Sequence, residues 1–143
     1  MRVKQISIFL ENKTGRLFEA LNALAKESIN IRALSIADTA QFGILRLIVN
    51  DPDKAKIVLD KSKFTVKESD VIAVGLDDKP GEIVKTLDIL QKAKIGVEYL
   101  YAFAERKDKH AIVIIKTESI DEGIKALKNG GATVLAAKEV YNL

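Results

Sequence analysis

The amino-acid sequence predicts an α+β fold built from two βαββαβ units in tandem. The first observation is a repeated segment, because residues 11–17 follow one apolar stretch and residues 77–83 follow another in the same way. The second is that the glycines of these segments, Gly15 and Gly81, lie 66 residues apart, and that apolar residues further along match at the same offset. The matched pairs are Leu21 with Leu87, Leu24 with Leu90, Ile29 with Ile95, Ile31 with Val97, Leu34 with Leu100, Leu47 with Val113, and Val49 with Ile115. The chain is therefore a duplication of one small fold.

Hydrophobic periodicity and turn residues predict the order β-α-β-β-α-β in the first copy. Consecutive or alternating apolar residues indicate strands, apolar residues at three- and four-residue spacing indicate helices, and a proline suits the first position of a helix. The expected elements are a strand over 6–10, a helix from Leu17 that Asn30 closes, strands over 31–36 and 44–49, a helix from Pro52 and a strand over 64–67.

The second copy repeats this order, and the two domains are expected to cover residues 1–69 and 70–143. Its elements are a strand over 71–76, a helix over 80–94, strands over 97–103 and 111–116, a helix from a Ser119–Glu122 capping box to Gly130, and a closing strand within 133–140. This order is the ferredoxin-like arrangement, an antiparallel sheet with helices on one face. Runs such as 112–115 are apolar on consecutive residues, so we expect the second sheet face to be covered too, by the other unit or by another chain.

Composition narrows the possible functions. Of the 143 residues 48% are hydrophobic and 30% charged, with no cysteine and one histidine, which argues against thiol chemistry and Cys/His metal sites. We expect neither a metal nor a cofactor. The net charge of +3 comes from 23 basic and 20 acidic residues that are interspersed, which indicates a solvated surface and not a nucleic-acid footprint. Without a signal peptide or an apolar run of membrane length, the expected location is the cytoplasm, away from the membrane.

The repeated turn is the candidate binding site. The segment from Asn12 to Gly15 connects the end of a strand to the start of a helix, where backbone N–H groups point outward and favour an anion such as a carboxylate. A plain helix cap and tight turn is the alternative reading, and duplication alone would copy such a turn. Arg16 stands in the first helical turn, where the helix dipole disfavours a cation, which hints at an anionic partner.

Three features together resemble the ACT domain, the small regulatory domain of amino-acid metabolic enzymes. They are the Asn/Asp-x-Pro/x-Gly-x-Leu/Ile pattern around Gly15 and Gly81, the step at 29–31 where the first helix leads into the second strand, and the βαββαβ order. The resemblance covers essentially the whole chain as two copies, as in stand-alone tandem ACT proteins. It implies a non-catalytic protein that binds a free L-amino acid at a domain interface and regulates amino-acid metabolism through a partner enzyme or regulator.

The resemblance also implies which residues bind the ligand. Asn12 or Asp78 and the backbone around Gly15 or Gly81 would hold it, and Asn30 would reach it from a neighbouring domain. The full set of expected ligand-binding residues is Asn12, Lys13, Thr14, Gly15, Arg16, Leu17, Asn30, Asp78, Pro80, Gly81 and Glu82.

Three differences between the two copies bear on which turn binds the ligand. Gly96 stands where the first copy has Asn30, and Pro80 replaces the threonine before the glycine. Asp78 replaces a neutral asparagine with a charge that would repel a carboxylate. We therefore favour the first-copy turn as the binding site.

Two other functions are weighed against this one. An RNA-binding module of the same topology would stack bases on aromatic residues of the two central strands, where the sequence offers only Phe9. An enzyme would need paired carboxylates, an activated nucleophile or a phosphate-binding loop, and the sequence has no evident set of these, so no catalytic residue is expected. The near-continuous apolar strands predict self-association, most simply as a homodimer.

Overall fold

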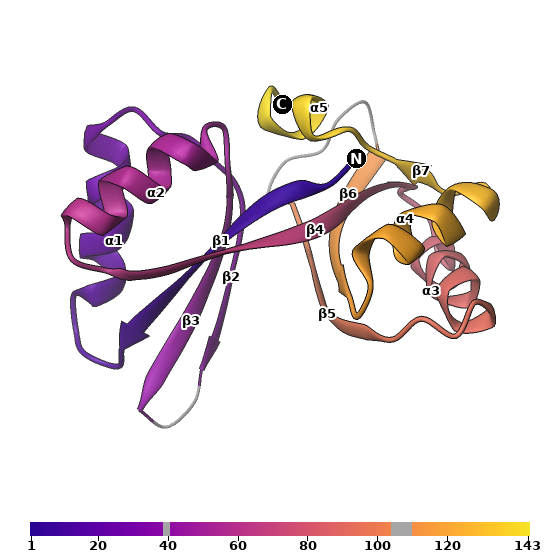
Figure 1. Ribbon diagram of the computed structural model, residues 1–143, viewed down its shortest axis with the longest axis horizontal. Helices are drawn as coiled ribbons and strands as arrows, with labels where there is room; N and C mark the ends of the chain where they lie inside the picture. Colours follow the sequence, from indigo (N-terminus) through magenta and orange to yellow (C-terminus); the bar gives the residue numbers. More distant parts are fainter. Residues whose placement is uncertain (39–40, 104–109) are drawn as a thin grey trace. The chain divides into compact units, whose positions relative to one another are not determined.

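The computed structural model describes residues 1–38, 41–103 and 110–143 (Figure 1). Its contacts divide the chain into two compact units, Lys4–Ser69 and Asp70–Leu143. The first three residues, Met1–Val3, belong with the second of these. We call them the N-terminal unit and the C-terminal unit, and each is described by itself.

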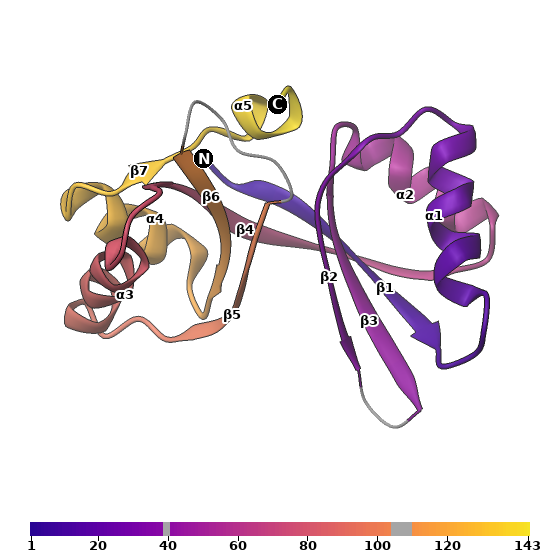
Figure 2. The same cartoon turned by 180° about the vertical axis from the view of Figure 1, so that it is seen from behind.

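The N-terminal unit is a four-stranded antiparallel sheet with two helices on one face (Figures 1 and 2). Its strands follow the order β2-β3-β1-β4, so β2 lies at the edge. The elements are β1 (Val3–Glu11), α1 (Arg16–Lys26), β2 (Ile31–Asp38), β3 (Phe42–Val49), α2 (Pro52–Lys61) and β4 (Thr65–Asp77).

A single apolar cluster joins the sheet of this unit to its helices. Alternate residues of β1 and β3 point toward the helices because side chains along a strand alternate between the two faces. They pack against buried residues of α1 and α2. The cluster contains Ile6, Ile8, Leu10, Ala20, Leu24, Leu45, Leu47, Val49, Ala55 and Leu59.

The ends of the two helices are set by local chemistry. Asp51 caps α2 because its side chain accepts a hydrogen bond from Lys54 N at 3.1 Å, and Pro52 occupies the first turn as expected. Helix α1 ends at Lys26, before the expected closing residue, and Ser28 takes a left-handed conformation with φ of 57°. The prediction that Asn30 closes the helix is therefore wrong.

The C-terminal unit repeats the arrangement with the order β5-β6-β4, and β7 pairs with the other edge of β4. Its apolar cluster again joins alternate strand residues to two helices, which pack through Leu90 and Leu127. Its remaining elements are α3 (Glu82–Lys92), β5 (Val97–Ala102), β6 (His110–Thr117), α4 (Ile120–Asn129), β7 (Thr133–Val134) and α5 (Ala137–Tyr141). The predicted fold class is confirmed.

Three details of the fold differ from the expectations. Strand β4 is continuous over 13 residues where two strands were expected. The capping box at the start of α4 is not formed, because the side chain of Ser119 makes no cap hydrogen bond. Separately, Thr117 Oγ1 donates to the Ser119 carbonyl at 2.8 Å. The closing strand is only two residues long and is followed by α5, whose start is held by Glu139 Oε2 accepting from Ala136 N at 2.8 Å.

Several strands are buried on consecutive residues, as their composition indicated. All four residues from Ile112 to Ile115 are at most 6% exposed, and Leu47, Ile48 and Val49 are fully buried. Neighbouring residues of a strand point to opposite faces, so over residues 47–49 of β3 and 112–115 of β6 both faces of the strand are inaccessible to solvent within one chain.

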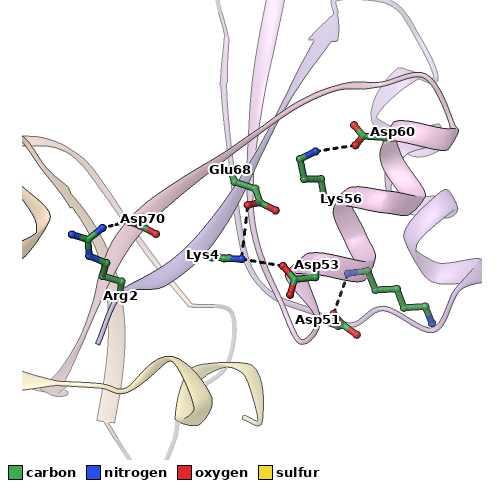
Figure 3. A network of polar contacts seen from close by, with 9 residues as sticks. Arg2, Lys4, Asp51, Asp53, Lys56, Asp60, Glu68 and Asp70 are labelled. Atoms are coloured by element: carbon green, nitrogen blue, oxygen red, sulfur yellow. Dashed lines mark hydrogen bonds and ion pairs between the residues drawn. The ribbon is translucent and has the colours of Figure 1, made fainter.

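Ion pairs hold the beginning of the chain (Figure 3). In the N-terminal unit Lys4 Nζ lies 3.0 Å from Asp53 Oδ1 and 4.0 Å from Glu68 Oε2. In the C-terminal unit Arg2 Nη1 lies 2.8 Å from Asp70 Oδ2, and Arg2 Nε donates to Asp121 Oδ1 at 3.0 Å. The hydrogen bonds from the guanidinium are the largest cause of a lowered pKa at the Asp121 carboxyl.

Candidate functional site

The turn between β1 and α1 depends on Gly15. This residue is the N-cap of α1 and has φ of 91° and ψ of −12°, a left-handed conformation that favours glycine. A Cβ atom added to it would have no heavy atom within 4 Å. Because the space in front of this backbone is open, a ligand can approach it closely.

The first turn of α1 offers hydrogen-bond donors to that space. The backbone N–H groups of Leu17 and Phe18 have no acceptor among the described residues, and the N-cap residue Gly15 has no side chain that could cap the helix. Further along, Glu19 N donates to the Gly15 carbonyl at 2.9 Å and starts the regular helical bonding. Unpaired N–H groups at the positive end of the helix dipole form an anion-binding position.

The charged side chains of this turn are paired with near neighbours. Lys13 Nζ lies 2.9 Å from Glu11 Oε2, and its hydrogen bond is the main cause of a lowered pKa at that carboxyl. Arg16 Nη1 donates to Glu19 Oε2 at 2.7 Å, and the guanidinium lies over the Phe64 ring with its central carbon 4.7 Å from the ring centroid. Arg16 Nε is buried and has no hydrogen-bond partner within residues 1–38, 41–103 and 110–143.

The second turn has nearly the same backbone conformation as the first. Gly81 is the N-cap of α3, with φ of 89° and ψ of −8°, and an added Cβ would again meet nothing within 4 Å. Lys79 N donates to the Asp77 carbonyl at 2.9 Å, as Lys13 N does to the Glu11 carbonyl at 2.8 Å.

The chemistry of the second turn is less suited to an anion. Pro80 has no backbone N–H at the position of Thr14. Asp78 stands in place of Asn12, and Glu82 adds a carboxylate that is 15% exposed in the first turn of α3. Repulsion from these groups favours the first turn over the second as a site for a carboxylate.

Asn30 is not brought to the turn of its own unit. It follows α1, whose 11 residues place it about 16 Å along the helix from Gly15. Its backbone is fixed by Asn50, because Asn30 N donates to Asn50 Oδ1 at 2.9 Å and Asn50 N donates to the Asn30 carbonyl at 3.1 Å. Gly96, its counterpart, keeps only the second of these contacts, since Glu118 N donates to the Gly96 carbonyl at 3.1 Å.

The open sheet face carries an aromatic residue that the sequence analysis missed. Strand β3 begins at Phe42, two residues earlier than expected, and the register places Phe42 opposite Glu11 and Phe9 opposite Ile44. Both phenylalanines lie on the same face and are 50% and 39% exposed. Two aromatic residues remain few for a surface that stacks several bases, and the RNA-binding alternative is not favoured.

Two other features were considered in the part of the chain that the structure describes, a metal site and a membrane-spanning helix. There, no group of three or more His, Asp and Glu side chains is placed to hold a metal ion. No helix within residues 1–38, 41–103 and 110–143 combines the length and apolar character needed to cross a bilayer.

Comparisons with known proteins agree with this architecture. A family model described as an ACT domain pair matches residues 1–141. The crystal structure of protein BT0572 from Bacteroides thetaiotaomicron is 45% identical, with a TM-score of 0.94 over 100% of this chain and 98% of that chain. The ligand-free regulatory subunit of aspartate kinase from Thermus thermophilus is 15% identical, with a TM-score of 0.62 over 90% and 92% of the two chains, and shows a similar fold. No curated protein matches the chain.

Proposed function

The chain belongs to the family of ACT domain pairs, and on this premise we propose that it is a non-catalytic cytoplasmic sensor that binds a free L-amino acid. The observation that carries the proposal is the first turn, where Gly15 keeps the backbone open and the N–H groups of Leu17 and Phe18 lack acceptors among the described residues. The ligand's carboxylate accepts hydrogen bonds from this helix N-terminus, and the side-chain oxygen of Asn12 is available to its ammonium group.

The proposed site is completed by a second domain. Because Asn30 lies at the far end of α1 from Gly15, it serves a ligand bound to the turn of another domain and not of its own. Its two backbone hydrogen bonds with Asn50 hold it in a fixed position for that role. Occupancy of the site then stabilises one domain pairing, and a partner enzyme or regulator of amino-acid metabolism responds to that pairing.

We also infer that the chain forms a homodimer. Parts of β3 and β6 are already buried on both faces within one chain, and the edge strand β2 carries the exposed apolar side chains that support a dimer. Leu34 and Ile36 lie opposite the core residues Leu47 and Leu45 on the helix side of the sheet, yet remain 44% and 54% exposed. An apolar edge of this kind favours pairing with a second copy.

A thermal-shift screen with the twenty amino acids tests the binding proposal. At a ligand concentration of about a hundred times Kd, linkage gives about 2.7 kcal/mol of stabilisation, or a rise in Tm of several degrees. The decarboxylated amine of the active amino acid should give no such rise through this site. Equal stabilisation by both would refute the anion-binding role of the helix N-terminus.

Matched variants locate the site. Gly15→Val should abolish binding of the amino acid to the folded protein, because the branched side chain disfavours the left-handed turn and fills the open space. Gly81→Val imposes the same change on the second turn and should leave that binding intact. Binding that survives Gly15→Val and is lost in Gly81→Val would move the site to the second copy.

A further inference from the structure

A small polar cavity lies in the C-terminal unit, between the first turn of α3 and the turn that ends α4. Its volume is about 240 Å³, which is smaller than the pockets that hold drug-sized ligands. Its walls include Glu82, Lys85 and Thr86 from α3 and Gly130, Gly131 and Ala132 from the end of α4. Gly81 and the backbone of the candidate turn do not line it.

Glu82 offers this cavity a carboxylate acceptor. Its side chain is only 15% exposed, and both of its ion pairs, to Lys85 at 2.8 Å and to Lys79 at 3.8 Å, are made by Oε1. Oε2 is not the atom through which Glu82 pairs with either lysine. The two lysine side chains are 70% and 59% exposed, so both cations remain close to solvent.

The N-terminal unit shows what the same space holds in the first copy. There Arg16 stands at the position of Glu82, and its guanidinium lies over the ring of Phe64. Phe64 corresponds to Ala132, because Phe64 N donates to the Leu59 carbonyl at 3.1 Å and Ala132 N donates to the Leu127 carbonyl at 2.9 Å.

The second copy therefore has neither the guanidinium nor the aromatic ring at these positions. The ion pair within the helix is reversed, from Arg16–Glu19 at 2.7 Å to Glu82–Lys85 at 2.8 Å. A buried threonine, Thr86, 3% exposed, replaces an alanine on the same wall. The result is a cavity lined by a partly buried carboxylate, at the position where the other copy has Arg16.

We propose that this cavity binds a small molecule carrying a guanidinium group, with Glu82 Oε2 as the acceptor that fixes it. A guanidinium is planar and supplies several donors, which suits this carboxylate oxygen and the hydroxyl of Thr86. The apolar side chain of Ile89, which also lines the cavity, is available to the stem of the molecule. The proposal goes beyond the amino-acid sensor function, and it uses residues of α3, the helix that follows the second turn.

Calorimetry on the full chain tests the proposal with three probes, agmatine, arginine and citrulline. Agmatine and arginine should bind, and citrulline, whose ureido group is neutral, should bind at least tenfold more weakly. Glu82→Gln keeps the shape and removes the charge, so it should weaken agmatine binding at least tenfold. Ala132→Phe restores the ring of the first copy and should abolish binding.

The control is Glu19→Gln, which removes a carboxylate from the matching helical turn of the N-terminal unit and should leave agmatine binding unchanged. If Ala132→Phe fails to fold, Glu82→Gln decides the question alone. The proposal is overturned if the wild-type chain takes up no agmatine at millimolar concentration, if citrulline binds equally, or if Glu82→Gln has no effect. Gly15→Val separates the two sites, because it should spare agmatine binding whether or not the amino-acid proposal holds.

Discussion

The two left-handed glycines allow a matched test of how the turns are stabilised. Gly15 and Gly81 have φ values of 91° and 89°, and neither has a heavy atom within 4 Å of an added Cβ. Replacing either with alanine therefore creates no clash, and the cost is that of the backbone torsion alone. Two nearly identical backbones should then lose the same stability.

The magnitude follows from two opposing terms. A left-handed conformation costs an L-residue about 1–2 kcal/mol. Alanine also restricts the unfolded chain, which returns about 0.4–1 kcal/mol. The net loss in the free energy of unfolding should be about 1 kcal/mol for each variant. Gly15→Asn should lose less, because asparagine tolerates this region better than alanine.

Urea denaturation followed by circular dichroism measures these losses. Gly43→Ala is the control, since Gly43 does not have a left-handed φ and its added Cβ would make only ordinary contacts, at 3.6 Å from the Ile36 side chain. It should be close to neutral. The reasoning fails if Gly15→Ala loses no more stability than Gly43→Ala, or if Gly15→Ala and Gly81→Ala differ by more than about 1 kcal/mol, the size of the effect itself.

Four further outcomes are expected. Asp51→Ala should lower the free energy of unfolding by about 1 kcal/mol, measured by urea denaturation, because it removes the side-chain cap of α2. Arg2→Ala should raise the pKa of Asp121 toward its ordinary value, measured by NMR titration. In the wild-type chain the lowered pKa stabilises the fold above the ordinary pKa of an aspartate, and this stabilisation is lost as the pH falls through the lowered value. The variant should lack this pH-dependent stabilisation. Asn30→Ala should weaken amino-acid binding by about 1–3 kcal/mol in calorimetry, whereas Gly96→Ala should change it little, since the added Cβ displaces only the end of a flexible glutamate side chain. Light scattering at micromolar concentration should show a dimer, and a lone 15.7 kDa species would contradict the inferred pairing.

Repetition made the fold predictable from sequence. The order of elements and the two glycine turns followed from hydrophobic periodicity and turn residues, and their recurrence in the second copy supported the prediction for the first. The continuity of β4 did not follow, because a strand that continues through Glu68, Ser69 and Asp70 has no apolar signal in its middle. The capping box at Ser119 is likewise not formed although the residue spacing fits, because spacing alone does not fix the side-chain orientation that the cap needs.

The candidate site was predictable only in part. The turn around Gly15 carries its own sequence signal, because a left-handed conformation favours glycine. No sequence motif marks the cavity beside Glu82. It lies where the second copy has Ala132 in place of the Phe64 ring and Glu82 in place of Arg16. Aligning the two copies position by position, with attention to changes of size and charge, would have pointed to it.

The sharing of strands between the two units has a consequence for engineering. Strand β1 crosses from one unit to the other between Val3 and Lys4. Strand β4 crosses between Ser69 and Asp70. A fragment that starts at Asp70 would therefore lack Arg2, and with it the hydrogen bonds to Asp70 and Asp121. Transplanting the second copy into another protein requires the first three residues of the chain to be supplied as well, so the two copies are no longer interchangeable modules.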